Sequence, residues 1–152
     1  MNISSEVTFS QGKKANRSEP KIIVADKNQI SRRRMARALA ERTLPLEATG
    51  SAAYLMQNLL HDGPSVIVLG GGLEKELSVV TLVSLLKSYD PHSTIILVAD
   101  NVSPSEEIKV CQKGIFYRMN RPVCALGWNE LQLVVDCACN RVMYATMSSR
   151  SH

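Results

Sequence analysis

The residues best suited to chemistry stand at the ends of short apolar segments of the sequence. Asp26-Lys27 follows the first such segment, Gly70-Gly71-Gly72 the third, Ala99-Asp100 closes the fourth, and Asn120-Arg121 follows the last. Successive glycine N–H groups, with Lys27 and Arg121 beside them, form the kind of nest that holds phosphate, sulfate or a carboxylate. Lys27 and Arg121 against Asp26 give a local net charge of one positive, which favours binding of an anion. The glutamates that follow the glycines in "GGGLEKEL" oppose it.

Apolar segments alternate with amphipathic ones along most of the chain, which predicts that strands alternate with helices. Such alternation favours a parallel sheet that is covered by helices on both faces. In these sheets ligands bind at the carboxyl ends of the strands, where the residues above stand. The expected strands are 21–25, 45–49, 65–69, 93–99 and 115–119, and the expected helices are 28–42, 51–63, 75–90, 103–113 and 128–147.

The ends of two helices carry recognisable capping residues. Asn28 or Ser31 can cap the first helix, because both side chains accept hydrogen bonds from free backbone N–H groups. Ser103 caps the fourth helix, Pro104 takes its first turn, and the acids that follow favour the positive end of the helix dipole.

The composition predicts one α/β domain over residues 21–147, preceded by a disordered basic arm (1–20) and followed by a short tail (148–152). No apolar run is long enough to cross a bilayer, and the polar start lacks the apolar core of a signal peptide, so we expect a cytoplasmic protein. The four cysteines form no CxxC pair and have no suitably spaced histidines. We therefore expect four buried thiols and no zinc site.

The chain also lacks a catalytic signature. No serine has a positioned histidine, and no pair of carboxylates has a recognisable spacing. We therefore predict no enzyme activity and no catalytic residue.

The segments, taken in order, resemble the receiver domain of bacterial two-component response regulators over residues 21 to about 145. "KIIVADKNQISRRRM" is similar to the family's first strand, acidic pair and first helix, and "PSVIVLGGGL" to its phosphate-accepting strand. "TIILVADN" lies where the fourth strand ends in Ser or Thr, and "KGIFYRMNRPV" resembles the fifth strand with its Lys-Pro. The resemblance implies a doubly wound, flavodoxin-like (βα)5 fold with five parallel strands in the order 2-1-3-4-5.

The family's phosphorylation chemistry does not carry over to this sequence. Of the acidic pair only Asp26 is kept, since Lys27 takes the second place, and the phosphate-accepting aspartate falls on Gly70, or on Gly71 if the loop slips by one residue. Glycine supplies no nucleophile, and a lone carboxylate beside an ammonium is a poor Mg²⁺ site. We therefore expect no phosphorylation and no cofactor, Mg²⁺ included, and hypothesise that Lys27 replaces the metal by pairing with Asp26.

The residues that report phosphorylation in the family are replaced as well. The Ser or Thr falls on Ala99, the lysine on Arg121, and the aromatic switch of the fifth strand on Arg118. The resemblance therefore implies a degenerate pocket without the usual switch.

Two surfaces are candidates for binding partners. In the family the signal leaves mainly through the fourth helix, fifth strand and fifth helix, and here the last helix has a second apolar flank beside its core stripe, formed by Leu133, Cys137 and Tyr144. Arg118 would lie on the same face. A helix that is apolar on more than one side suits contact with another protein, including a second copy of the chain, although a tilted helix within the core is the alternative.

The second surface is basic. Residues 13–42 hold ten Lys or Arg against three Asp or Glu, and Arg33, Arg34 and Arg37 share a side of the first helix. Such a surface can contact nucleic acid, an anionic membrane or an acidic protein. There is no interleaved aromatic pattern and no helix-turn-helix signal, so a solvated basic face is the leading interpretation.

Three functions remain open at this stage. The first is a non-phosphorylatable, receiver-like protein-interaction module in bacterial signal transduction or transcription control. The second is a sensor that binds a small anion or nucleotide at Gly70–Gly72. The third is nucleic-acid contact through the basic N-terminal third.

Overall fold

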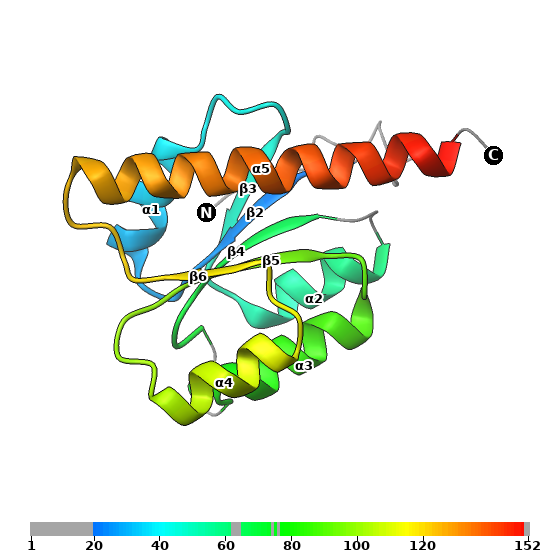
Figure 1. The fold of residues 1–152 in the computed structure, drawn as a ribbon. Coiled ribbons are helices and arrows are strands. Elements are labelled where there is room, and N and C mark those ends of the chain that lie inside the picture. Colours follow the sequence, from blue (N-terminus) through cyan, green and yellow to red (C-terminus); the bar gives the residue numbers. More distant parts are fainter. Residues whose placement is uncertain (1–19, 62–64, 74, 76, 151–152) are drawn as a thin grey trace.

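The computed structural model describes residues 20–61, 65–73, 75 and 77–150. Residues 1–19 of the predicted arm and residues 151–152 of the predicted tail lie outside this part of the chain. Within it, strands and helices alternate throughout (Figure 1). They are β2 (Ile22–Ala25), α1 (Gln29–Ala38), β3 (Leu46–Thr49), α2 (Ala52–His61), β4 (Val66–Gly70), α3 (Val79–Tyr89), β5 (Thr94–Val98), α4 (Pro104–Gln112), β6 (Tyr117–Met119) and α5 (Ala125–Arg150).

The described strands form one parallel sheet of five, in the order β3-β2-β4-β5-β6. The predicted fold class and the strand order 2-1-3-4-5 are therefore confirmed. The order reverses beside β2, since the chain first steps outward to β3 and then crosses back to β4. This reversal opens the sheet edge at the carboxyl ends of β2 and β4, which is where ligands usually bind in such folds.

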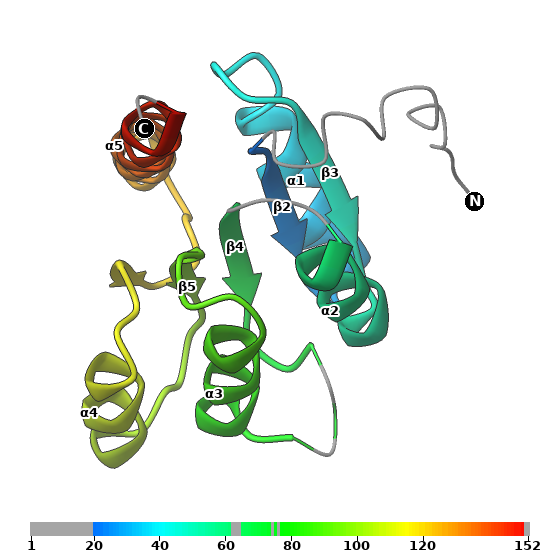
Figure 2. The same ribbon diagram turned by 90° about the vertical axis from the view of Figure 1, so that its right-hand side faces the viewer.

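Helices cover both faces of the sheet, and alternate strand residues enter two separate cores. Ile22 and Val24 pack with residues of α1 and α5 on one face, whereas Ile23 and Ala25 pack with residues of α2, α3 and α4 on the other. Figure 2 shows α1 and α5 on one side of the strands and α2, α3 and α4 on the other. Both faces are buried, which explains why the central strands are apolar without alternation.

Side-chain caps fix where several helices begin. Asn28, rather than Ser31, caps α1, because its side chain accepts a hydrogen bond from the Ser31 N–H at 2.8 Å. Ser103 caps α4 as predicted, within a capping box completed by Glu106. Helix α3 begins at Val79 rather than at residue 75, since Ser78 caps it, and α5 begins at Ala125 rather than Trp128 and continues to Arg150.

The prediction that all four cysteines are buried is wrong. Cys139 is buried in the core, but Cys111, Cys124 and Cys137 are exposed. On α5, Cys137 and Cys139 are two positions apart and point in nearly opposite directions, so only one of them can face the sheet. Among the described helices, none is both long enough and apolar enough to span a membrane.

Candidate functional site

The candidate site lies at the carboxyl edge of the sheet, where the strand ends converge. Asp26 follows β2, Gly70 is the last residue of β4, Ala99 follows β5, and Arg121 lies just beyond β6. Parallel strands bring these positions to one edge although they are far apart in the sequence.

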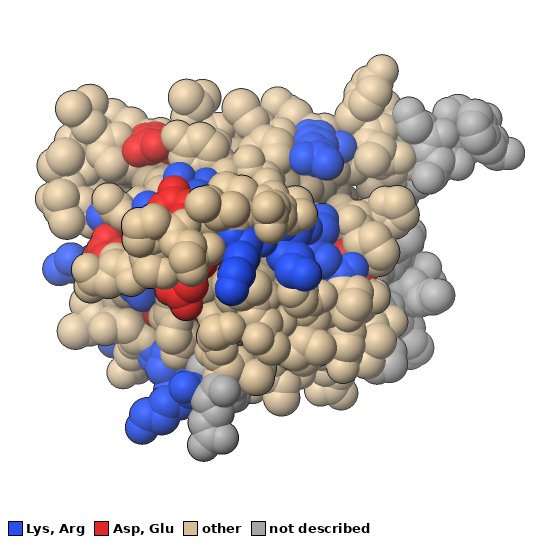
Figure 3. Space-filling view, turned by 60° about the horizontal axis from the view of Figure 1, so that its bottom comes forward, with Lys and Arg blue, Asp and Glu red and all other residues tan. Residues whose placement is uncertain are grey.

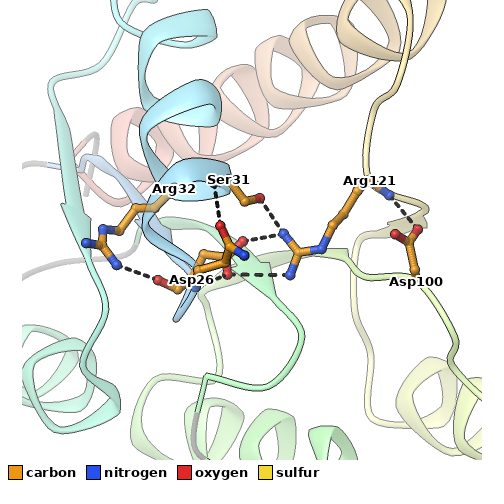
Figure 4. A network of polar contacts seen from close by, with 6 residues as sticks. Asp26, Ser31, Arg32, Asp100 and Arg121 are labelled. Atoms are coloured by element: carbon orange, nitrogen blue, oxygen red, sulfur yellow. Dashed lines mark hydrogen bonds and ion pairs between the residues drawn. The ribbon is translucent and has the colours of Figure 1, made fainter.

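Asp26 is fully buried, at 0% exposed, and its carboxylate accepts hydrogen bonds from Asn28 and Arg121. Oδ1 accepts a hydrogen bond from the Asn28 N–H at 2.9 Å. Oδ2 lies 2.6 Å from Arg121 Nη1, and Arg121 Nη2 donates to Oδ1 at 3.4 Å (Figure 4). A buried carboxylate needs such a partner, because an unpaired charge in the interior is strongly unfavourable.

Arg121 is held in place from several elements. Its backbone N–H donates to Asp100 Oδ1 at 3.0 Å, and its guanidinium also donates to Ser31 Oγ on α1. The Arg121 side chain is 26% exposed, so the guanidinium closes the pocket from the solvent side. Figure 4 shows it reaching from the end of β6 across to Asp26.

Gly70 lets the Asp26 carboxylate lie where it does. A Cβ atom at Gly70 would overlap Asp26 Cγ and Oδ2 and would come within 3.0 Å of Asp26 Cβ. The next glycine is also confined, since a Cβ at Gly71 would lie 3.0 Å from Ala99 Cβ. The space that a side chain at position 70 would need is therefore filled by Asp26.

The hypothesis that Lys27 pairs with Asp26 is wrong. Arg121 is the ion-pair partner of Asp26, and Lys27 is exposed. Lys27 lies in the bend between β2 and α1, where its side chain is exposed.

An open hollow of about 380 Å³ lies beside the ion pair. Gly71, Gly72 and Arg121 line it together with the acids Asp100 and Glu106. The predicted anion nest is thus only partly assembled: Lys27 does not line the hollow, Arg121 is engaged by Asp26, and two carboxylates face an incoming anion. This arrangement disfavours anion binding at the glycines.

Arg118 is tied to the neighbouring helix. Its side chain donates to Asn120 Oδ1 at 2.7 Å, and Nε lies 3.7 Å from Glu107 Oε2 on α4. It is only 16% exposed. Arg118 thus connects β6 to α4 and contributes less to the open surface than the sequence indicates.

The other residues of the two candidate surfaces are exposed. Leu133, Cys137 and Tyr144 lie exposed on α5. Arg33, Arg34 and Arg37 are exposed on α1. Arg34 and Arg37 line a shallow hollow of about 280 Å³ with Trp128, at the junction of α1 and α5.

Sequence reasoning named Asp100 at a strand end and Ser31 as a possible cap, but it gave neither of them, nor Arg32, a role in holding the ion pair. Ser31 and Asp100 hold Arg121, and Arg32 Nη1 donates to the Asp26 backbone carbonyl at 2.8 Å. Their signal in the sequence is position alone, since each follows a strand end by a few residues. In the described part of the chain, no three His, Cys, Asp or Glu side chains come together as metal ligands.

Comparison with solved structures identifies the fold. The receiver domain of an HD domain-containing protein from Pseudomonas fluorescens Pf-5 superposes with a TM-score of 0.71 at 19% identity, over 83% of this chain and 98% of that one. A CheY-like response regulator receiver domain protein from Methanospirillum hungatei JF-1 gives 0.72 at 12% identity, over 84% and 99%. The NtrX receiver domain from Brucella abortus gives 0.67 at 17% identity, over 78% and 97%.

These likenesses establish the receiver fold, as the sequence resemblance implies. No family model matches the chain, and no curated protein matches it.

Proposed function

We propose that this chain is a receiver-like protein-interaction module of bacterial signal transduction whose output does not depend on aspartyl phosphorylation. The pairing of buried Asp26 with Arg121 above Gly70 carries the proposal. Phosphoryl transfer to a protein needs a nucleophile and a cation that neutralises the incoming charge. We infer that Gly70 stands at the nucleophile's position, where it supplies no side chain, and that the Arg121 guanidinium beside Asp26 takes the role of the cation.

The ion pair favours a single conformation of the pocket. A receiver that switches must have two conformations close in free energy, with a ligand that binds one of them better. Arg121 bonds to Asp26 and Ser31 and is anchored by Asp100, so its movement would break several hydrogen bonds at once. The module then acts through its surface, and its regulation lies in abundance and partner binding.

The test is phosphorylation and metal binding by the purified chain. The protein is incubated with acetyl phosphate, or with beryllium fluoride, in the presence of Mg²⁺, and its intact mass and ¹⁹F NMR spectrum are recorded. We expect no phosphoryl adduct and no bound fluoride signal. A stoichiometric adduct on the wild-type chain would overturn the proposal.

A matched variant shows that the assay can succeed on this scaffold. The combination Lys27→Asp, Gly70→Asp, Ala99→Thr and Arg121→Lys supplies the acids, hydroxyl and lysine that the resemblance implies for phosphorylation. We expect this variant, once shown to be folded, to gain the adduct. The single change Gly70→Asp is the control, and we expect it to remain unmodified because Lys27 still stands where a Mg²⁺ site would need a second acid.

A further inference from the structure

Helix α5 carries a second stripe of side chains on the side away from the sheet. Its positions are spaced alternately by three and four residues, which is the spacing of a coiled-coil seam. Leu133 is 65% and Tyr144 73% exposed, and Cys137 is exposed between them. The positions of the stripe are Leu126, Glu130, Leu133, Cys137, Asn140, Tyr144 and Met147.

This stripe is distinct from the one that holds α5 to its own domain. Leu131, Val135, Ala138 and Val142 are buried against the sheet. Leu133 and Cys137 lie two positions from Val135, about 200° around the helix axis. A 26-residue helix is about 39 Å long, so α5 offers a long outer face, and Figure 1 shows its C-terminal part extending past the strands.

Charges beside the stripe suit a second copy of the same helix in parallel. Asp136 directly precedes the stripe position Cys137, and Arg141 directly follows the stripe position Asn140. In a parallel pair, residues in these two places on opposite helices face each other, so Asp136 meets Arg141 twice by symmetry. The Asp136 side chain is 43% exposed although it also bonds to Arg42, and Arg141 is exposed over the Phe116 ring.

The wider face between α4, β6 and α5 suits self-association less well. Burial lowers the pKa of the Lys87 ammonium, and the like charge of nearby Arg141 lowers it further. Lys109 and Lys113, at the end of α4, are exposed nearby, and Figure 3 shows Lys and Arg gathered near the middle of this face. A two-fold interface centred there would place basic groups against basic groups.

We propose that the chain forms a parallel homodimer in which α5 pairs with α5 of a second copy along Leu133, Cys137, Asn140 and Tyr144. This inference deepens the proposed function, because it names a second copy of the chain as the partner that the interaction module binds. Asn140 supplies one polar layer in the seam, where two facing side-chain amides can donate to and accept from each other. Glu130 interrupts the apolar stripe and is bonded by the Tyr117 hydroxyl, so the close contact begins at Leu133.

Dimerisation is measured first, by sedimentation equilibrium over a range of protein concentrations. We expect a reversible dimer, and we expect Leu133→Lys to weaken it at least tenfold, because each substituted lysine meets its own copy across the axis. Ile108→Lys is the control, since Ile108 is an exposed apolar residue on α4, outside the stripe. A chain that is monomeric at every concentration, or one weakened equally by both changes, overturns the proposal.

Disulfide formation then tests the orientation. Copper phenanthroline and oxygen oxidise two facing thiols to a disulfide, accepting two electrons and two protons. We expect rapid dimer cross-linking through Cys137 in the Cys111→Ser/Cys124→Ser variant and none in Cys137→Ser. Adding Tyr144→Cys to Cys137→Ser should restore the cross-link, because a parallel pair brings each stripe position to its own copy.

Two results would contradict the parallel seam. The first is cross-linking that persists through Cys111 or Cys124 when Cys137 is replaced, and the second is cross-linking at position 137 but not at 144. These tests are independent of the phosphorylation assay. A dimer that is phosphorylated would contradict the proposed function alone, and a monomer that stays unmodified would contradict the dimer alone.

Discussion

Arg121 Nη1 lies 2.6 Å from Asp26 Oδ2, although the two residues are 95 positions apart in the sequence. They follow β6 and β2, which are separated in the sheet by β4 and β5. The arginine therefore reaches across the carboxyl ends of β4 and β5, and the absence of a side chain at Gly70 leaves room for the carboxylate that it binds. This ion pair links the ends of β2 and β6 across the sheet edge.

The ion pair should contribute measurably to stability. We expect Arg121→Met to lower the free energy of unfolding by about 2 kcal/mol, because it leaves the Asp26 carboxylate buried without its cation. The loss is smaller than the about 3–5 kcal/mol of a fully buried pair, since Arg121 is partly exposed. Urea denaturation followed by circular dichroism measures the change.

A double-mutant cycle separates the ion pair from side-chain packing. In the Asp26→Asn background, where the charge is already gone, Arg121→Met should cost less than about 1 kcal/mol. Arg42→Met is the matched control, since Arg42 pairs with half-exposed Asp136 and such pairs contribute about 0–1 kcal/mol. Equal losses for Arg121→Met in both backgrounds would show that the charge of Asp26 is irrelevant.

A side chain at Gly70 should destabilise the protein as long as Asp26 is present. We expect Gly70→Ala to destabilise the fold by about 1–3 kcal/mol, because the new methyl group must displace the Asp26 carboxylate and its bonds to Arg121. Thermal or urea denaturation reports the loss. In the Asp26→Ala background the same change should be nearly neutral.

Gly50→Ala is the control for Gly70→Ala. A Cβ at Gly50 would lie 2.6 Å from Arg32 Nη1, which is the far end of a long side chain that can turn aside. Turning aside breaks the hydrogen bond from Arg32 to the Asp26 backbone carbonyl but leaves the Asp26–Arg121 ion pair in place, so we expect a loss of no more than about 1 kcal/mol at Gly50. A loss at Gly50 as large as that at Gly70 would mean that crowding alone, and not the Asp26 contact, explains the effect.

The sequence predicts the fold well because the fold depends on local patterns. Apolar segments such as 66–70 and 94–98 are continuous since both faces of the sheet are covered, and Pro104 and Ser103 set a helix start by their own chemistry. The partner of Asp26 is not predictable in this way. It depends on how far the side chain of Arg121 reaches across two other strands, which no local pattern encodes.

Exposure of the cysteines was equally hard to predict from composition. Cysteine is usually buried, but Cys111, Cys124 and Cys137 lie on outward faces. Helical spacing carries the missing information, since Cys139 falls on the core stripe of α5 and Cys137 does not. Average burial of a residue type is therefore a weaker guide than its place on the helix.

Lys27 should be dispensable for stability. Because it is exposed and Arg121 is the cation bound to Asp26, we expect Lys27→Ala to change the free energy of unfolding by no more than about 0.5 kcal/mol. Differential scanning calorimetry should give nearly the same melting temperature for the variant and the wild type. A fall as large as that of Arg121→Met would restore Lys27 as a partner of the buried carboxylate.

Cys139 should be unreactive in the folded protein while the exposed thiols react. Burial raises the pKa of Cys139 from 9.0 to about 11, and the nearby Asp136 carboxylate acts in the same direction. We expect Ellman's reagent at pH 8 to modify Cys111, Cys124 and Cys137 rapidly and Cys139 only after unfolding. Modification of all four thiols at one rate in the native protein would contradict the packing of α5.

The same pKa shift makes stability depend on alkaline pH. Below pH 9 the Cys139 thiol keeps its proton in both the folded and the unfolded chain, so its contribution is complete there. Between pH 9 and about 11 the unfolded chain loses this proton first, which favours unfolding by about 2 kcal/mol at the upper end. Urea denaturation across this range should show the loss in wild type and in Cys111→Ala but not in Cys139→Ala. Since Cys139→Ala itself leaves a small cavity, the comparison concerns the slope of stability against pH; identical slopes in all three proteins would show that another group is responsible.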